Sequence, residues 1–206
     1  MPLVRATLEQ EAAEPAARSD DPADLAAELR SEDDAVRRDA ARRAAQRHPE
    51  VLFEALDDVR SADLLELILS QLTTHRAEML PDRLAEMLAD PEPTRRNRAV
   101  DCLTAMGAEA EPAIARALRS NDADVRIQAL AVVPSLPAER AEALLIDLLG
   151  WEPDPNACNC ALEALLQVGT HASQHLIAPL SQRFAQEPSI EFALVLLGER
   201  LAEDAP

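Results

Sequence analysis

The chain has 206 residues and a formal net charge of −18, and although 48% of its residues are hydrophobic only 2% are aromatic. A strongly acidic surface repels the phosphate backbone, so this charge argues against non-specific binding of DNA or RNA. The absence of Tyr and the single Trp disfavour an aromatic platform on which bases or sugars would stack. We therefore expect no nucleic-acid partner.

The totals also bear on location. The segment from Met1 to Ser19 lacks the apolar core of a signal peptide, and no stretch approaches the uninterrupted apolar length of a membrane span. Three cysteines, an odd number, favour reduced thiols over a disulfide framework. We expect a cytoplasmic protein with no membrane partner. All 20 basic residues are Arg, which is typical of a bacterial genome rich in G and C; the alternative is a functional preference for Arg.

The first 20 residues are rich in Ala and Glu and are predicted to form an acidic lead, either a frayed helix or a flexible segment. Ser19, Asp20 and Asp21 precede Pro22, an order typical of a helix N-cap followed by the proline that a first turn accepts. We therefore predict one repeat domain over residues 21–206.

The clearest helical unit follows an acidic turn that begins at Asn121. Val125, Ala129, Val132 and Val133 are spaced so that their side chains share one face of an α-helix. The frame Val-Arg-x-x-Ala-Leu recurs at steps of 28, 31, 30, 32 and 32 residues, which is the range of repeat proteins. The equivalent positions are Ala40, Ile68, Ala99, Ala129, Ala161 and Ala193. A shorter apolar helix precedes most copies, so we predict an all-α fold, an α-solenoid of about six helix-turn-helix repeats.

The residues of this frame resemble a known repeat. A Leu-rich first helix, an Asp-containing turn and then Val-Arg-x-x-Ala, best at Asp33–Arg37 and Asp122–Arg126, resemble the short HEAT-like repeats of phycobilisome lyases over roughly residues 22 to 202. The resemblance implies that an acidic residue of one turn pairs with the Arg of a neighbouring repeat. Other residues replace that Arg in the second, fifth and sixth copies, namely Leu65, Cys158 and Ile190.

Arginines gather on the second helix of the first repeat. The segment Ala35–Arg47 carries five Arg against a single Asp39, a local excess of four positive charges. In HEAT-like solenoids the second helices line the concave face, so the resemblance implies that such arginines converge there. Because the Arg fork binds carboxylates in bidentate fashion, we expect a protein partner that presents an acidic segment. The alternative is internal pairing with the acidic turns. The predicted contacts are Arg37, Arg38, Arg42, Arg96 and Arg126.

Three further segments invite predictions. The stretch Gly150–Asn156 is predicted to be an irregular turn. In it, Trp151 is either an interface anchor or packed over the ends of its own two helices. The apolar helix around Leu64–Leu72 is either enclosed or an exposed interface, which leaves a monomer or a weak homodimer open. The last helix, Pro188–Ala202, is expected to be a C-terminal cap. The aromatic residues Phe53, Phe184 and Phe192 are expected in the core.

One constellation has the composition of a metal site. Cys158, Cys160, His171 and His175 supply the donors of a zinc site, but a helix over 155–168 would turn the two thiols about 200° apart. Small core thiols are therefore favoured. The His-Glu dipeptides of HEAT-like iron hydroxylases are absent, as are a glycine-rich nucleotide motif and a serine nucleophile elbow.

We predict no catalytic residue, cofactor or metal, and favour a non-enzymatic adaptor. The alternative, which the lyase resemblance implies, is an accessory protein for cofactor attachment or enzyme maturation.

Overall fold

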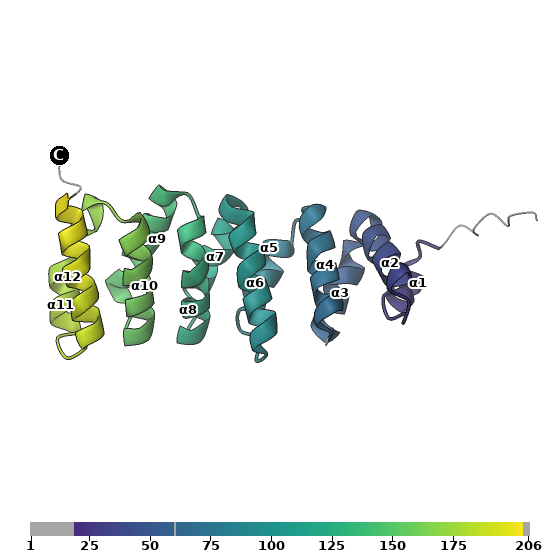
Figure 1. Cartoon of the computed structure of the whole chain (residues 1–206), viewed down its shortest axis with the longest axis horizontal. Helices are drawn as coiled ribbons and strands as arrows, with labels where there is room; N and C mark the ends of the chain where they lie inside the picture. The colour runs from purple at the N-terminus through teal and green to yellow at the C-terminus, as the bar shows by residue number, and fades with distance from the viewer. Residues whose placement is uncertain (1–18, 60, 204–206) are drawn as a thin grey trace, which may run out of the picture. The chain divides into compact units, whose positions relative to one another are not determined.

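The computed structural model describes residues 19–59 and 61–203, and in these ranges the secondary structure is entirely helical (Figure 1). Helix follows helix in the order of the predicted repeats, which confirms the predicted all-α solenoid. The helices are α1 (Pro22–Glu28), α2 (Asp34–Arg47), α3 (Pro49–Asp58), α4 (Ala62–Thr74), α5 (Leu80–Met87), α6 (Pro93–Met106), α7 (Glu111–Ala117), α8 (Ala123–Val132), α9 (Ala138–Trp151), α10 (Pro155–Val168), α11 (Ile177–Arg183) and α12 (Pro188–Glu203). Short 3₁₀ segments are η1 (Gly107–Ala110), η2 (Val133–Ser135) and η3 (His171–Leu176).

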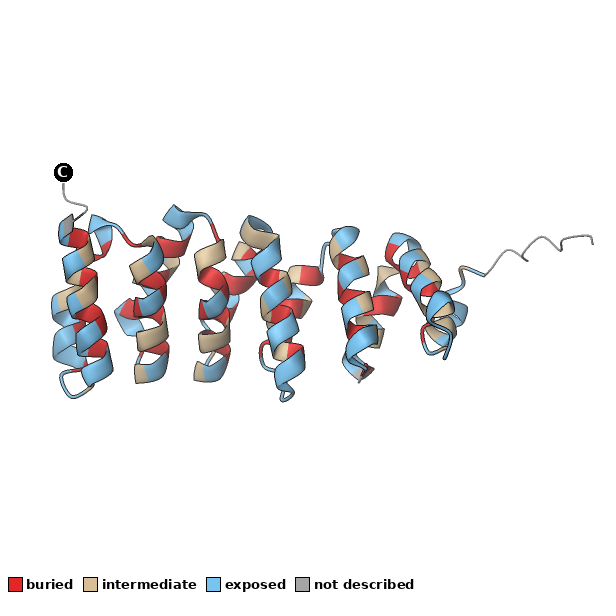
Figure 2. Ribbon diagram, viewed as in Figure 1, coloured by how far each residue is buried: buried red, intermediate tan, exposed pale blue. Residues whose placement is uncertain are grey.

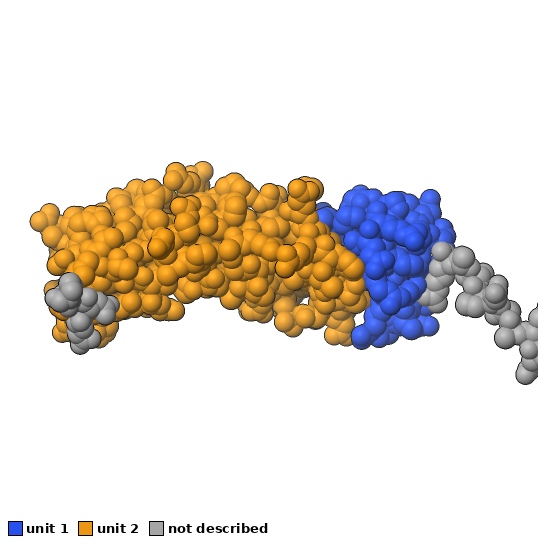
Figure 3. All heavy atoms as spheres, turned by 90° about the horizontal axis from the view of Figure 1, so that it is seen from above, with its two compact units in different colours: residues 1–59 blue, residues 60–206 orange. Residues whose placement is uncertain are grey.

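The chain divides into two compact units, Met1–Val59 and Arg60–Pro206 (Figure 3). In the first unit, α1 and α3 both pack on α2 and also contact each other. Most of the predicted acidic lead, residues 1–18, lies outside the described residues. The expectation of one repeat domain over residues 21–206 stays a prediction.

The second unit consists of two layers of helices. The second helices of the repeats, α4, α6, α8, α10 and α12, form one layer, and α5, α7, α9 and α11 form the other (Figure 1). Each second helix packs on the next, and the first helices pack behind them. Along each helix, buried residues recur at the helical period (Figure 2). The core between the layers is aliphatic and close-packed, so burial of Leu, Ile and Ala drives the assembly.

The repeat frame found in the sequence marks the inward face of every second helix. All six frame positions are buried, from Ala40 in α2 to Ala193 in α12. Small Ala side chains at five of the six positions let neighbouring helices approach closely. The apolar α4 is largely enclosed: Leu65, Ile68, Leu69 and Leu72 are buried, and Leu64 and Leu67 are half-buried. In the part of the chain that the structure describes, no helix has the length and apolar character needed to cross a membrane.

Aspartates begin several helices. The side chains of Asp21, Asp33, Asp122 and Asp154 each accept a hydrogen bond from a backbone N–H of the first helical turn, at 2.8 to 2.9 Å. Such caps satisfy amide groups that have no partner within the helix. The N-cap predicted ahead of Pro22 is confirmed at Asp21.

Arginines of the next repeat complete the ends of α9 and α10. Arg183 of α11 donates to the carbonyl oxygens of Leu149 and Gly150. Arg200 of α12 donates to Leu165 O at 3.1 Å and also to the carbonyl of Leu166. The last carbonyl groups of a helix lack partners inside it. Each of these two helix ends is therefore finished by a side chain from the following repeat.

Two local expectations are wrong. The segment Gly150–Asn156 is not one irregular turn, because α9 continues to Trp151 and α10 begins at Pro155. Within the short connection, the buried Glu152 side chain accepts a hydrogen bond from the backbone N–H of Asp154 at 3.0 Å. Phe192 is 64% exposed, whereas Phe184 is buried as expected.

Candidate binding surfaces

The frame arginines Arg37, Arg96 and Arg126 share one structural role. In each, Nη1 donates to the carbonyl oxygen six residues earlier, at 2.8 Å in all three cases. The acceptors are Ser31, Asp90 and Ser120, which lie in the turns before α2, α6 and α8. Arg37 and Arg96 also reach the next carbonyl along, at 2.9 and 3.1 Å. These predicted contact residues therefore tie the second helix to its own connecting turn.

Arg126 also forms a buried ion pair. Its Nε donates to Glu152 Oε2 at 2.6 Å and its Nη2 to Oε1 at 2.5 Å, while Arg126 is 4% exposed and Glu152 is fully buried. The hydrogen bond and the charge of Glu152 raise the pKa of Arg126, against the opposing effect of burial. Glu152 belongs to the turn of the next repeat, as the resemblance implied. With all three guanidinium nitrogens bonded inside the protein, Arg126 offers little to a partner at the surface.

Arg38 and Arg42 lie on the exposed side of α2. Their side chains are 70% and 60% exposed. Each pairs with a carboxylate of the same helix: Arg38 Nε with Asp34 Oδ2 at 2.6 Å, and Arg42 Nη2 with Asp39 Oδ1 at 2.5 Å. Exposed pairs of this kind contribute little to stability. Of the predicted arginines, these two present their guanidinium groups most fully to solvent.

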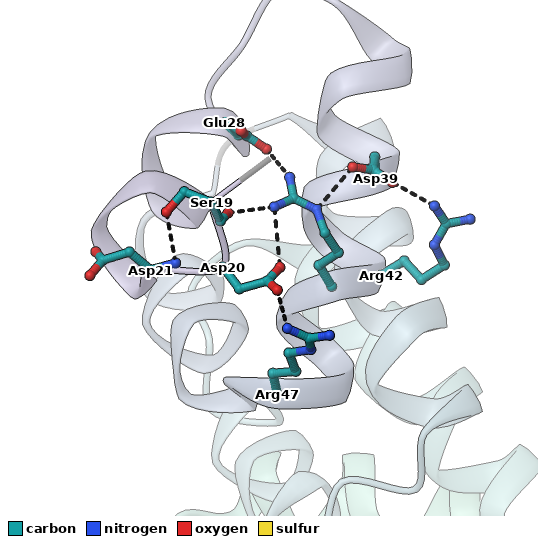
Figure 4. Close-up of polar contacts among 8 residues, drawn as sticks. Ser19, Asp20, Asp21, Glu28, Asp39, Arg42 and Arg47 are labelled. Carbon is teal, nitrogen blue, oxygen red and sulfur yellow. Dashed lines mark hydrogen bonds and ion pairs between the residues drawn. The ribbon is translucent and has the colours of Figure 1, made fainter. Parts of the chain in front are cut away.

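Arg43, which was not among the predicted contact residues, bonds several residues of the first unit that Figure 4 labels. Arg43 donates to Asp39 Oδ2 at 2.9 Å and to Ser19 O at 2.6 Å, and also pairs with Glu28. Burial alone would lower the pKa of Arg43, but the charges of Glu28 and Asp39 raise it. Arg47 bonds Asp20 beside it. Arg43 follows the buried Ala40 by three residues, a helical spacing that places it on the flank of the core.

Trp151 lies at the end of α9 and is partly packed and partly exposed to solvent. Its ring packs on the guanidinium of Arg126, 5.4 Å from ring centroid to Cζ, and the residue remains 44% exposed. A pocket of about 410 Å³ opens beside it. The lining residues are Arg119, Ser120, Asn121, Arg126, Trp151 and Pro153. A role as an interface anchor stays a prediction.

The residues of the considered zinc site lie in different environments. Cys158 is fully buried, and burial raises the pKa of its thiol to about 11. Cys160 is half-buried, whereas His171 and His175 are exposed in η3. Within residues 19–59 and 61–203, no three or more His, Cys, Asp or Glu side chains are grouped to hold a metal ion.

Glu142 is a second buried carboxylate, which the sequence did not single out. It is 7% exposed and accepts hydrogen bonds from Thr170 N at 2.6 Å and from Ser173 Oγ at 2.5 Å. Burial would raise the pKa of Glu142, but the hydrogen bonds from Ser173 and Thr170 together lower it. This carboxylate fixes the start of η3 against α9.

Comparison with known proteins identifies no family for this chain. No protein-family model matches the chain, and no curated protein matches it. Among solved structures, an engineered protein is 16% identical over 89% of this chain and 97% of its own, with a TM-score of 0.43. Human deoxyhypusine hydroxylase in complex with glycerol is 21% identical over 89% and 74%, with a TM-score of 0.49. A designed armadillo repeat protein is 14% identical over 87% and 99%, with a TM-score of 0.42. Likeness at this level carries no argument about activity.

Proposed function

We propose that this chain is a non-enzymatic scaffold of the bacterial cytoplasm that binds a protein partner through an acidic segment. The observation that supports the proposal most directly is the pair Arg38 and Arg42, which lie one helical turn apart on α2. Their side chains are 70% and 60% exposed in a chain whose net charge is −18. Side chains at i and i+4 are neighbours on a helix surface, so one acidic segment can reach both.

The local pairing of these arginines does not prevent such binding. The ion pair of Arg38 uses Nε and that of Arg42 uses Nη2. Exposed pairs contribute only about 0.2–1 kcal/mol, so a carboxylate of a partner competes readily with Asp34 and Asp39. The Arg fork donates two parallel hydrogen bonds to a carboxylate, so the contact has a defined orientation as well as opposite charges. Arg37 and Arg96 would act indirectly, by holding the turns beside their helices.

The test is affinity capture of tagged protein from native lysate, followed by titration of the purified partner. The Arg38→Glu, Arg42→Glu variant is expected to lose the partner, with binding weakened by at least about tenfold through charge repulsion. The matched control is Arg116→Glu, Arg119→Glu, which reverses two arginines that are 61% and 70% exposed and paired with carboxylates. All proteins should give the same circular dichroism. Equal loss in both variants, or retention in the first, contradicts the proposal.

A second function draws on the pocket at Trp151. Its volume of about 410 Å³ lies within the range of small-molecule sites. This supports the lyase-type alternative, an accessory protein for cofactor attachment or maturation of an enzyme. The test is absorption spectroscopy and mass spectrometry of native protein purified from its source. A bound small molecule that Trp151→Ala loses, at unchanged thermal stability, is the expected result; protein that carries none argues against this function.

A further inference from the structure

The last helix of the second unit exposes large apolar side chains. Phe192 is 64% exposed and Val195 is 53% exposed, and both lie on α12. Leu196, four residues after Phe192, is half-buried. Residues three and four apart are neighbours on a helix surface. We call Phe192, Val195 and Leu196 the α12 patch.

The repeat register shows that this exposure is specific to α12. Each second helix has one residue directly before the buried frame position and one residue two places after it, and these flank its outward side. From α4 to α12 the pairs are Leu67 and Ser70, Arg98 and Asp101, Gln128 and Ala131, Cys160 and Glu163, and Phe192 and Val195. Among these described helices, only α12 places large apolar side chains at both positions.

The core does not require these side chains. The inward face of α12 is already complete, because Ile190, Leu194, Leu197 and Leu201 are buried. Phe192 and Val195 therefore add apolar surface to the outside of a helix whose packing is satisfied without them. Grouped apolar side chains on a soluble surface mark sites of interaction, and an exposed aromatic residue is a frequent anchor of such sites.

The charges around the patch indicate what covers it. Glu191 and Glu199 are exposed on α12, and Glu163 is exposed on the adjacent α10. The guanidinium of Arg200, the one basic residue of α12, is turned toward the carbonyl groups of α10. The rim is therefore acidic. Two copies of this chain would bring like charges together at this surface, whereas a cationic segment would be attracted to it.

We infer that the α12 patch docks an amphipathic helical segment of another protein, with apolar side chains at i, i+3 and i+4 and Lys or Arg on its flanks. Helices that lay such a face into an apolar surface are a common mode of peptide recognition. This goes beyond the proposed binding of an acidic segment at Arg38 and Arg42. The two surfaces prefer opposite charges and belong to different units, so either proposal can fail alone.

The experiment uses full-length protein and a short fluorescent peptide that carries Leu at i, i+3 and i+4 on a Lys-rich helix. Fluorescence anisotropy should show binding by the native protein. The Phe192→Gln, Val195→Gln variant should bind at least about tenfold more weakly, since it loses the anchor. The control is Met79→Gln, which removes an apolar side chain that is 62% exposed elsewhere in the same unit; it should bind as the native protein does.

A scrambled peptide of identical composition, whose Leu residues do not share a helical face, distinguishes charge attraction alone from docking of an apolar helix face. Native protein should prefer the ordered peptide, and Glu191→Gln, Glu199→Gln should reduce the salt dependence of its binding. Equal affinity for the two peptides overturns the inference, as does equal binding by the Phe192→Gln, Val195→Gln and Met79→Gln variants. Sedimentation that shows a native dimer dissociated by Phe192→Gln, Val195→Gln assigns the patch to a second copy and also overturns it.

Discussion

Arg126 of α8 and Cys158 of α10 occupy equivalent positions on neighbouring helices, three residues before a buried frame Ala, and both are buried. The turn of α8 is held by Arg126, which reaches back to Ser120 and forward to Glu152. The turn of α10 has no such arginine. It is held by Glu152 and Asp154, whose side chains accept backbone N–H groups at 3.0 and 2.9 Å.

The difference shows what this position requires. It faces inward, so a thiol fits there without further provision. A buried arginine such as Arg126 needs a carboxylate that balances its charge, since a buried unpaired ion is very unfavourable. At Arg126 that carboxylate is Glu152, 26 residues further along the chain. The frame arginines Arg37, Arg96 and Arg126, which the sequence suggests as partner contacts, therefore hold the repeats together internally.

The largest expected effect comes from breaking this pair on one side. Glu152→Gln leaves the buried Arg126 charge uncompensated and should reduce the free energy of unfolding by about 3 kcal/mol, as for other broken buried ion pairs. Urea denaturation followed by circular dichroism measures the change. Replacing both partners, Arg126→Met with Glu152→Leu, should restore stability to within about 1 kcal/mol. A single variant as stable as the native chain would show that the pair is not what holds this turn.

A smaller effect is expected at Glu142, where uncharged donors surround a buried carboxylate. Glu142→Ala should cost about 1–3 kcal/mol at neutral pH, because Thr170 and Ser173 lose their acceptor. The pKa of Glu142 is lower in the folded chain than its ordinary value. Its stabilisation is therefore complete above the ordinary Glu pKa and is lost as the pH falls through the folded pKa.

The native chain and Glu142→Ala should accordingly approach each other in stability as the pH is lowered from neutral into the acid range. Thermal or urea denaturation at a series of pH values gives this difference directly, and the many other carboxylates cancel between the two proteins. A gap that stays constant down to low pH would mean that the cost of Glu142→Ala arises from packing.

The smallest expected effect is a difference in labelling rate between two thiols, which is measured on the native chain without any substitution. With a pKa of about 11, the Cys158 thiol is ionised to only about one part in a thousand at pH 8, and the thiolate is the reactive form. The half-buried Cys160, two residues along α10, should react first with iodoacetamide, and denaturant should equalise the two. Mass spectrometry of the labelled peptides measures the order. Early labelling of Cys158 would show that the inward position opens readily.

The regular features of this fold were predictable because they depend on neighbours in sequence. The helix considered over residues 155–168 has the observed limits of α10, and the cap expected among Ser19, Asp20 and Asp21 is Asp21. Glu152 looks like any acidic turn residue, since its partner lies 26 positions away. The same limit applies to Arg43, which bonds Ser19 at a separation of 24.

The candidate surfaces were predicted less well, for a related reason. Charge counting on α2 found Arg38 and Arg42, whose environment is their own helix. Charge counting did not distinguish these two residues from Arg37, which lies next to Arg38 in the sequence but donates to the carbonyl oxygen of Ser31. Phe192 was expected in the core because aromatic residues usually are. Phe192 is exposed because the neighbouring helices leave its face of α12 uncovered. Its place directly before the frame position Ala193 could have predicted this exposure.

The bonds of Arg183 and Arg200 also bear on how the chain is made. Arg183 reaches a carbonyl of α9 that lies 34 residues closer to the N-terminus, and Arg200 does the same for α10. A ribosome releases the protein from its N-terminus onward. When α9 and α10 emerge, the groups that finish them have not yet been synthesised. For these two helices, synthesis therefore precedes completion of the helix end by about one repeat, and a ribosome that stalls before Arg183 would leave α9 with an unfinished end.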